Sequence, residues 1–254
     1  MRPLYLKDVA ARDARGLGQV QGGGLQGMGD RIEPEARAPR EAAFNVPWTL
    51  AALIGALLAT HGWRLLTGVG VERFALTPED LGRGRWGALI SYQFVHGGWA
   101  HVLMNCGFTL AFGAPTARFL GAGARGAAAF FAFFLTCGVL AALGYAGVLA
   151  LENLAGREAG PWALVGASGA ASGLLGAAAR LIEGRGRLGP MTGRTVAGIT
   201  AGWIGVNAVL GLTGLTPGAG GLPVAWPAHI LGYAAGLILI SPFAAAAGVR
   251  RRES

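Results

Sequence analysis

Residues 126–149 read GAAAFFAFFLTCGVLAALGYAGVL, a run without a charged side chain. A helix needs about 20 consecutive, mostly apolar residues to cross the hydrocarbon core of a bilayer, so this run predicts a transmembrane helix. Five further apolar stretches lie on either side of it, at residues 46–66, 99–119, 168–182, 195–215 and 228–246. The sequence therefore predicts an all-α polytopic membrane protein with six transmembrane helices.

The composition agrees with this class of protein. Hydrophobic residues make up 53% of the chain and charged residues 13%, whereas soluble domains have about a quarter charged residues. The formal charge is +8, but the basic residues lie between apolar stretches and do not cluster with exposed aromatic residues, so no nucleic-acid partner is predicted. The 45 glycines suit close helix packing in lipid, and Gly198/Gly202 and Gly232/Gly236 have the GxxxG spacing.

Basic residues at the ends of the stretches predict the orientation in the membrane. Sixteen of the 21 Lys and Arg residues lie in the N-terminal tail, at the second and fourth connections, and after the sixth stretch. Because Lys and Arg are enriched on the cytoplasmic side, both termini are predicted to be cytoplasmic. We expect a mostly disordered tail at 1–45, a membrane domain at 46–246 and a basic tail at 247–254. The first outside loop, 67–98, is long and rich in aromatics, which predicts structure of its own.

Few polar residues occur inside the six stretches, and none of them is Asp or Glu. A transporter driven by membrane carboxylates would lack its usual ligands, and a Ser-His-Asp triad would lack its third member. His101 and Asn105 are four residues apart and therefore share one helix face. The other candidates are Ser168, Asn207 and His229. Asn207 has no such partner in its stretch and is interpreted as structural.

Ser168 stands in the motif Gly166-Ala-Ser168-Gly169, where the fourth stretch begins. Such a serine can simply cap a helix. It can also be a nucleophile, because the free N–H groups at a helix N-terminus can stabilise an oxyanion. In the predicted orientation Ser168 and His229 lie at similar depth, so His229 is a candidate general base. Ser172 is a weaker candidate nucleophile, because position 170 is Ala rather than Gly.

Two interpretations of the remaining histidines are open. His101 and Asn105 carry side-chain N–H groups that could stabilise an oxyanion, or they could form structural hydrogen bonds between helices. Alternatively His96, His101 and His229 could bind a metal ion. The interval from His96 to His101 differs from the i, i+4 pair of helical metalloproteases, and no Glu accompanies it, so no metal or other cofactor is predicted.

Three motifs occur in order along the chain: His96-Gly-Gly-Trp-Ala-His101-Val-Leu-Met-Asn105, then Gly166-Ala-Ser168-Gly169, then Ala228-His229-Ile-Leu-Gly232 with Gly236 following. With them, residues 46–246 resemble the rhomboid family of intramembrane serine proteases. The resemblance implies a six-helix rhomboid-like bundle with a Ser168–His229 dyad. It implies an oxyanion hole formed by His101, Asn105 and the backbone N–H of Ser168. It also implies close packing of the sixth helix on the fourth, through Gly232 and Gly236 on one and Gly169, Gly173 and Gly176 on the other.

The resemblance further implies an endopeptidase that cleaves single-pass transmembrane proteins near the outer face of the bilayer. Lys7 is the only lysine beside 20 arginines, which is typical of a GC-rich bacterial genome, so a bacterial inner membrane is expected. A catalytically inactive, client-binding relative is the alternative, although such relatives usually lack the Ser or the His. The chain departs from the family at Ala117, where many members carry Glu, at Arg85-Trp86, where the order is usually reversed, and at Ser172, where some carry an aromatic residue that stacks on the base.

Overall fold

The computed structural model describes residues 45–157, 162–214 and 224–249. The predicted N-terminal tail, apart from Asn45, and most of the C-terminal tail lie outside these residues. The elements follow in the order α1 Trp48–Thr67, η1 Val71–Arg73, α2 Pro78–Gly82, α3 Ala88–Ser91, η2 Tyr92–Phe94, α4 Trp99–Leu120, α5 Ala124–Leu154, α6 Ser168–Glu183, α7 Arg194–Thr213 and α8 Trp226–Ala246. An isolated bridge between Leu76 and Leu164 is the only β structure in the described part of the chain, so the all-α prediction is confirmed.

Each of the six predicted transmembrane stretches coincides with one long helix. Of these helices, α1, α5, α7 and α8 are long and apolar enough to cross a membrane. The other two, α4 and α6, do not have both properties, because α4 carries polar His101 and Asn105 and α6 has 16 residues. Four spans are thus supported by length and composition, and the count of six stays a prediction.

Helix α5 is longer than the apolar run that predicted it. It begins at Ala124 and ends at Leu154, beyond the predicted 126–149 at both ends. The prediction stopped where charged Arg125 and Glu152 enter the sequence. A helix does not need to end there, because its backbone hydrogen bonds continue outside the apolar stretch. The N–H of Ala155, for example, donates to the carbonyl of Leu151.

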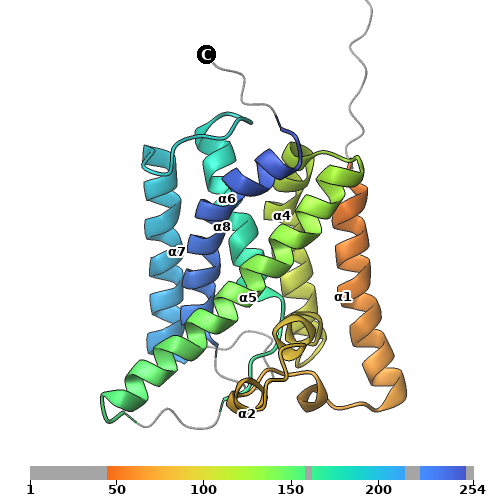
Figure 1. Ribbon diagram of the computed structural model, residues 1–254, viewed down its shortest axis with the longest axis vertical. Helices are drawn as coiled ribbons and strands as arrows, with labels where there is room; N and C mark the ends of the chain where they lie inside the picture. The colour runs from red at the N-terminus through yellow and green to blue at the C-terminus, as the bar shows by residue number, and fades with distance from the viewer. Residues whose placement is uncertain (1–44, 158–161, 215–223, 250–254) are drawn as a thin grey trace, which may run out of the picture. The chain divides into compact units, whose positions relative to one another are not determined.

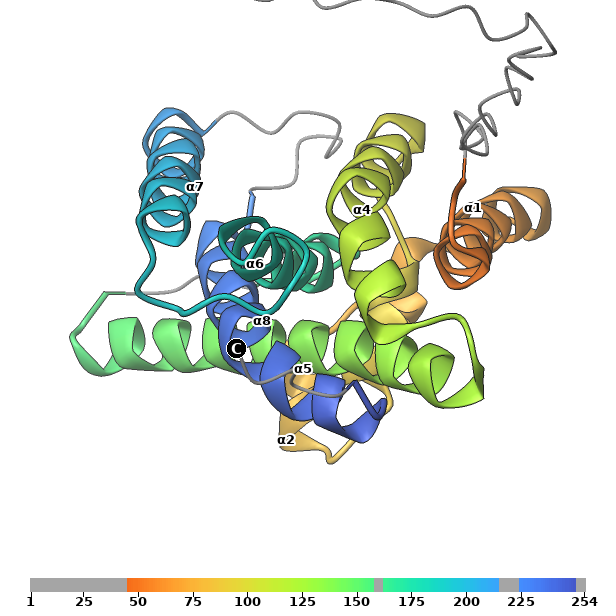
Figure 2. The same cartoon turned by 90° about the horizontal axis from the view of Figure 1, so that it is seen from above.

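Helix α6 lies at the centre of the bundle. Thirteen of its 16 residues are buried, and it contacts α4, α5, α7 and α8; in Figure 2 it lies between α7 and α4, with α8 and α5 below it. Helix α5 crosses the others obliquely, whereas α1 and α7 stand at opposite sides (Figure 1). A helix that packs against four others must be thin, and α6 meets that need because most of its residues are Gly, Ala or Ser.

The backbones of α6 and α8 touch directly through their glycines. A methyl group at Gly232 would overlap the carbonyl oxygen of Gly169, and one at Gly236 would overlap the carbonyl oxygen of Gly173. In the reverse direction, a methyl group at Gly176 would overlap the carbonyl oxygen of Tyr233. This is the contact that small residues permit between helices in lipid.

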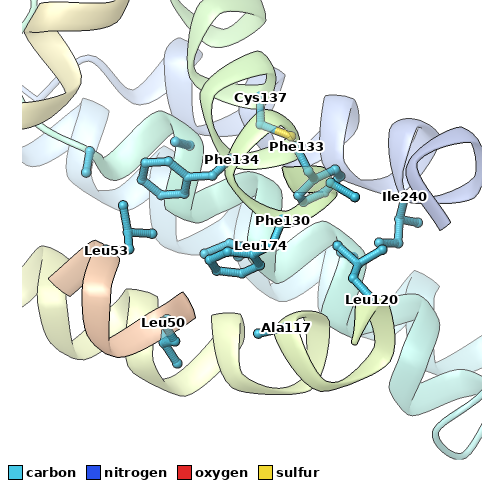
Figure 3. Close-up of a cluster of buried hydrophobic side chains, with 14 of the residues drawn as sticks. Leu50, Leu53, Ala117, Leu120, Phe130, Phe133, Phe134, Cys137, Leu174 and Ile240 are labelled. Atoms are coloured by element: carbon cyan, nitrogen blue, oxygen red, sulfur yellow. The ribbon is translucent and has the colours of Figure 1, made fainter. Parts of the chain in front are cut away.

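The run 126–149 that opened the sequence supplies the centre of the apolar core. Phe130, Phe133 and Phe134 of α5 are fully buried, and Leu50 of α1 and Leu174 of α6 belong to the same cluster (Figure 3). The cluster also contains residues of α4 and α8, and the ring centroid of Phe133 lies 5.6 Å from that of Phe243 in α8. The core therefore joins the central helix to α1, α4, α5 and α8.

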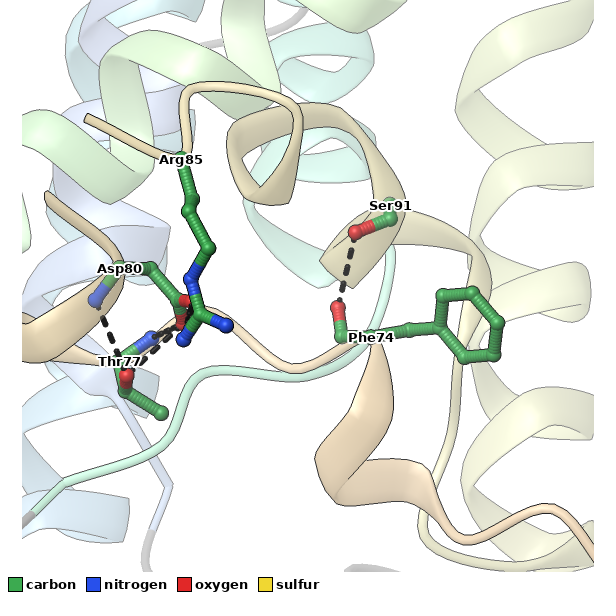
Figure 4. A network of polar contacts seen from close by, with 5 residues as sticks. All are labelled: Phe74, Thr77, Asp80, Arg85 and Ser91. Atoms are coloured by element: carbon green, nitrogen blue, oxygen red, sulfur yellow. Dashed lines mark hydrogen bonds and ion pairs between the residues drawn. The ribbon is translucent and has the colours of Figure 1, made fainter. Parts of the chain in front are cut away.

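The first loop is structured, as predicted, and contains η1, α2, α3 and η2. At the start of α2, Thr77 and Asp80 form a capping box, in which the Asp80 N–H donates to Thr77 Oγ1 and the Thr77 N–H donates to Asp80 Oδ2 at 2.9 Å (Figure 4). Arg85 forms an ion pair with the same carboxylate, and Ser91 Oγ donates to the carbonyl of Phe74. These local contacts give a loop of short helices a single conformation.

The loop is also attached to the bundle. The Tyr92 hydroxyl donates to the carbonyl of Gly138 in α5 at 2.6 Å, and Gln93 Nε2 donates to the carbonyl of Leu135 at 3.3 Å. A side chain at Gly138 would overlap Gln93, so this glycine makes room for the docked loop. The first loop is therefore held on α5, the longest helix.

The contact between α6 and α8 predicts the effect of a single methyl group. Gly236→Ala is expected to destabilise the protein by about 1–3 kcal/mol, as overpacking does in cores, and to lower the midpoint of thermal unfolding in detergent. Gly202→Ala is the matched control, since Gly202 belongs to the other GxxxG pair and a methyl group there would meet no described atom within 4 Å. Equal midpoints for the two variants would contradict the assigned contact.

The capping box predicts an acid-dependent contribution to stability. Burial raises the pKa of Asp80, but the hydrogen bonds from Thr77 and the charge of Arg85 outweigh it and hold the pKa below its ordinary value. A carboxylate with a lowered pKa stabilises the fold above its unfolded-state pKa, and this contribution is lost as the pH falls through the folded-state value. Asp80→Asn is thus expected to cost on the order of 1 kcal/mol at neutral pH and less in acid.

Thermal unfolding of Asp80→Asn and wild type at a series of pH values checks this expectation. Glu79→Gln is the control, because it removes the neighbouring carboxylate, which is exposed and outside the capping box. A difference between Asp80→Asn and wild type that does not shrink at low pH would refute the role assigned to the charge of Asp80.

Candidate active site

Ser168 is the first residue of α6 rather than its cap. The N-cap is Ala167, and no side chain caps the helix. The Ser168 hydroxyl instead faces α8, where its Oγ lies 2.8 Å from Nε2 of His229. The structure thus brings together the two residues that the sequence analysis paired, and the interpretation of Ser168 as a helix cap is wrong.

The segment before Ser168 is held by the first loop. The N–H and carbonyl groups of Leu164 exchange hydrogen bonds of 2.8 and 3.0 Å with those of Leu76. Two residues further on, the Gly166 N–H donates to the carbonyl of Tyr92 at 2.9 Å. Because Tyr92 is itself bonded to α5, the position of Ser168 depends on the docked loop.

His96 makes a third contact to this segment. Its Nε2 accepts a hydrogen bond of 3.4 Å from the N–H of Ala167, the residue before Ser168. Burial lowers the pKa of His96 to about 3, so the ring is neutral at physiological pH and can accept. The carbonyl of His96 accepts a bond from Arg64 Nη1 at 3.0 Å. His96 was predicted as part of the first motif and weighed as a metal ligand, but its contact with Ala167 was not predicted, because the spacing gives no signal for it.

His101 directs one ring nitrogen toward the serine loop. Its Nδ1 accepts a long hydrogen bond of 3.4 Å from the N–H of Gly97, which leaves the ring proton on Nε2. A methyl group at Gly166 would lie 2.7 Å from Nε2 of His101, so this nitrogen is close to the loop. Gly166 has a φ of 103°, a conformation that other residues rarely adopt, so glycine is needed there for two reasons.

Asn105 lies one turn along α4 from His101. Its side chain is buried, and Nδ2 donates one of its hydrogens to the carbonyl of His101 at 3.0 Å. An amide nitrogen carries two hydrogens, so the second can serve another acceptor. The four-residue spacing does put both side chains on one face of α4, where they line the same cavity as Ser168.

The cavity beside Ser168 and His229 has a volume of about 610 Å³. Its walls are mostly apolar, and its polar groups include those of the two histidines, Asn105 and Ser168. A pocket with apolar walls and a few convergent polar groups is the usual form of a binding site. Residues of five long helices and the first loop line it: Thr77, Glu79 and Tyr92 of the loop; Met104 and Phe108 of α4; Tyr145 of α5; Ser172 of α6; Trp203, Val206 and Leu210 of α7; Ala228 and His229 of α8.

His229 has a second polar partner that the sequence analysis missed. Its Nδ1 lies 2.8 Å from Oδ1 of Asn207 in α7. A structural role was predicted for Asn207, and the hydrogen bond gives it a specific partner on another helix. Trp203 lies one turn before Asn207, and its ring centroid is 6.1 Å from that of His229. The spacing of Trp203 and Asn207 puts both on one face of α7. This spacing is the one feature of the sequence that could have indicated their contact with His229.

Ser172 occupies the place where an aromatic residue was considered as a brace for the base. Its Oγ donates to the carbonyl of Ser168 at 2.7 Å and is buried. The aromatic neighbour of His229 comes from α7 instead, in the form of Trp203. Ala117, another of the three departures, is buried in the apolar core.

The alternative of a metal site has no support from the geometry. Among residues 45–157, 162–214 and 224–249, no three His, Cys, Asp or Glu side chains are arranged to hold a metal ion. The rings of His96 and His101 are close, with centroids 5.0 Å apart. In each ring, however, the one nitrogen that has a hydrogen-bond partner accepts from a backbone N–H.

Comparison with known protein families gives a match to the Rhomboid domain over residues 83–245, which contain all three motifs and helices α3 to α8 almost to its end. The chain belongs to the rhomboid family. Rhomboids are in general intramembrane serine proteases, and with four helices in its described part able to cross a bilayer this one is a multi-pass membrane protein. A comparison with curated proteins found no match.

The approach of His101 to the serine loop predicts a strong effect of Gly166→Ala. The methyl group would displace Nε2 of His101, which the sequence analysis predicted as an oxyanion donor, and loss of one such donor typically lowers the rate about 100-fold to 1,000-fold. The rate at which a fluorophosphonate probe labels Ser168 should therefore fall at least about tenfold. Gly156→Ala is the control, because Gly156 also has a positive φ, of 74°, but a methyl group there meets no described atom within 4 Å. Equal labelling of both variants would argue against His101 as a donor.

Proposed function

We propose that this rhomboid is an intramembrane serine endopeptidase that uses Ser168 as nucleophile and His229 as general base. The observation that carries the proposal is the 2.8 Å separation of Ser168 Oγ and His229 Nε2 at the wall of an apolar cavity. Serine is a weak nucleophile until a neighbouring base accepts its proton, and histidine is the usual base. Membership of a family of intramembrane proteases supports the same reaction class.

The proposed reaction begins with attack of Ser168 Oγ on the carbonyl carbon of the scissile peptide bond. The hydroxyl proton passes to Nε2 of His229, and the carbonyl oxygen becomes an oxyanion. When the tetrahedral intermediate collapses, His229 returns the proton to the leaving amine and an acyl-enzyme remains. Water then attacks the acyl carbon with the same histidine as base, which releases the second product and restores Ser168.

Three donors surround the region where the oxyanion would form. They are Nε2–H of His101, the second amide hydrogen of Asn105 and the backbone N–H of Ser168, which is at the first turn of α6 and has no acceptor within that helix. The partial positive charge at the N-terminus of α6 favours the same anion. Donors fixed before the reaction starts are the largest single source of catalysis in most acyl-transfer enzymes.

The walls of the cavity support a membrane-embedded substrate. Met104 of α4 and Val206 of α7 line the cavity and are each about half exposed on the bundle, so apolar surface continues from the cavity outward. A transmembrane segment of a single-pass protein has the apolar surface that fits such a path. We therefore propose single-pass membrane proteins as substrates, cleaved within the bilayer near its extracytoplasmic face.

The orientation and location are part of the proposal. Ser168 and His229 lie at the N-terminal ends of α6 and α8, and the positive-inside rule puts these ends on the extracytoplasmic side, with both termini in the cytoplasm. The arginine-rich composition favours the plasma membrane of a bacterium. The surrounding bilayer is then the protein's constant partner.

Cleavage of a single-pass model substrate in proteoliposomes tests the proposal. Ser168→Ala and His229→Ala should each reduce kcat/KM to the background of the assay, since removing either group costs on the order of a millionfold in a soluble serine protease. Ser172→Ala removes a hydroxyl one turn away and should reduce the rate far less. Cleavage by Ser168→Ala at the wild-type rate, or probe labelling of Ser172 in place of Ser168, would refute the assignment.

The same experiment separates the alternative function, that of an inactive rhomboid-like protein which binds membrane clients. Such a protein would retain a co-purifying transmembrane client but would neither cleave it nor react with a fluorophosphonate probe. The short contact between Ser168 and His229 is not needed for client binding, which is why we favour the protease.

A further inference from the structure

Asn207 is a buried amide on a helix that is otherwise largely exposed. Of the 20 residues of α7, two are buried, Val196 and Asn207, and the side chain of Asn207 is fully buried. Its Oδ1 lies 2.8 Å from Nδ1 of His229, on the side of the ring opposite the contact with Ser168. A polar group in such a place is costly unless it is bonded, so the contact with His229 requires an explanation.

The orientation of the amide group is fixed by its other end. Nδ2 of Asn207 donates to the backbone carbonyl of Trp203 at 2.9 Å. If the amide were turned over, Oδ1 would face that carbonyl oxygen and two acceptors would repel each other. Oδ1 therefore faces His229, and because an amide oxygen only accepts, Nδ1 of His229 must carry the proton of that hydrogen bond.

The position of this proton decides what the other nitrogen can do. A neutral imidazole has one N–H donor and one acceptor nitrogen. With the proton on Nδ1, Nε2 has a free lone pair, and this nitrogen lies 2.8 Å from Ser168 Oγ. The hydroxyl of Ser168 then donates to Nε2, which is the arrangement a general base needs before the nucleophile attacks.

We infer that Asn207 is a positioning residue that holds His229 in the tautomer and orientation required to accept the proton of Ser168. The inference rests on the proposed function, because it gives the histidine the role of base. During the reaction Nδ1–H of the charged imidazolium continues to donate to Oδ1, so the bond strengthens as the proton arrives. Trp203 acts beside it on the same helix face, and its Nε1–H donates to the carbonyl of His229 at 3.4 Å.

The wild-type protein provides the first test, which does not depend on proteolysis. Nitrogen-15 NMR of histidine-labelled protein in detergent micelles reports which ring nitrogen of a neutral histidine carries the proton, and the His229→Gln variant identifies the signals of His229. We expect the Nδ1–H tautomer for His229 in the wild type. A dominant Nε2–H tautomer would overturn the inference, whatever the activity of the protein.

Variants of Asn207 provide the second test. Asn207→Leu keeps the size of the side chain but removes the acceptor, and it should lower kcat about 10-fold to 100-fold with KM little changed, because hydrogen bonds to a charged group are the strong ones. Asn207→Asp should restore most of that loss. It should also move the acidic limb of the pH profile of kcat/KM to higher pH, since a carboxylate stabilises the protonated imidazole.

Thr200→Val is the matched control. Thr200 Oγ1 forms a 2.7 Å hydrogen bond with the hydroxyl of Tyr233, so this variant also removes one hydrogen bond between α7 and α8, but away from His229. We expect it to leave the pH profile and the tautomer unchanged. A loss of activity in Thr200→Val equal to that in Asn207→Leu, with an unshifted profile in Asn207→Asp, would mean that Asn207 only holds the helices together and would overturn the inference.

The two proposals can fail separately. Absence of cleavage by the wild type with the Nδ1–H tautomer present would refute the protease and leave the hydrogen bond established. Normal cleavage by Asn207→Leu with the tautomer unchanged would refute the role of Asn207 and leave the protease intact. If Asn207→Leu does not fold, the wild-type tautomer of His229 and the pH profile of Asn207→Asp still test the positioning role of Asn207.

Discussion

The direct contact of α6 with α8 is the constraint on which the site depends. In lipid no hydrophobic force draws helices together, so close association requires small residues where backbones meet. Here Gly232 and Gly236 face the carbonyl oxygens of Gly169 and Gly173. Gly169 directly follows Ser168, and Gly232 lies one turn after His229, so the packing of the two helices also sets the distance between Oγ and Nε2. The proposed reaction therefore depends on these glycines as well as on the two side chains proposed to react.

A second constraint comes from outside the helices. The backbone just before Ser168 bonds to Leu76 and Tyr92 and to the ring of His96, all of which belong to the first loop. That loop is in turn held on α5 by the hydroxyl of Tyr92. The packing of α6 on α8 thus sets the position of His229, and the first loop sets the position of the turn that carries Ser168. Such independent supports are what a site needs if its groups are to be held ready before the substrate arrives.

Sequence predicted much of this arrangement, and the limits have physical reasons. The six long helices follow from apolar runs, but α5 continues past Arg125 and Glu152, because hydropathy marks where lipid ends and not where a helix ends. Ser168 and His229 were found from local motifs. The contact of Asn207 with His229 was not predicted, because the two residues are 22 positions apart on different helices and no periodicity within α7 reveals such a contact. The hydrogen bond from Ala167 to His96 was not predicted either, because these residues are 71 positions apart.

The use of an amide beside His229 follows from the surroundings of the site. Neither α7 nor α8 contains Asp or Glu. A carboxylate in the place of Asn207 would lose its contact with water. Because the neighbouring His229 is neutral before it accepts a proton, that charge would be unpaired, and an unpaired buried charge costs several kcal/mol. The amide oxygen accepts the same hydrogen bond from Nδ1–H without that cost, so in the proposed role it holds His229 in the Nδ1–H tautomer. An amide stabilises an imidazolium less than a full negative charge would, so in the proposed reaction the oxyanion donors on α4 and α6 carry more of the catalysis.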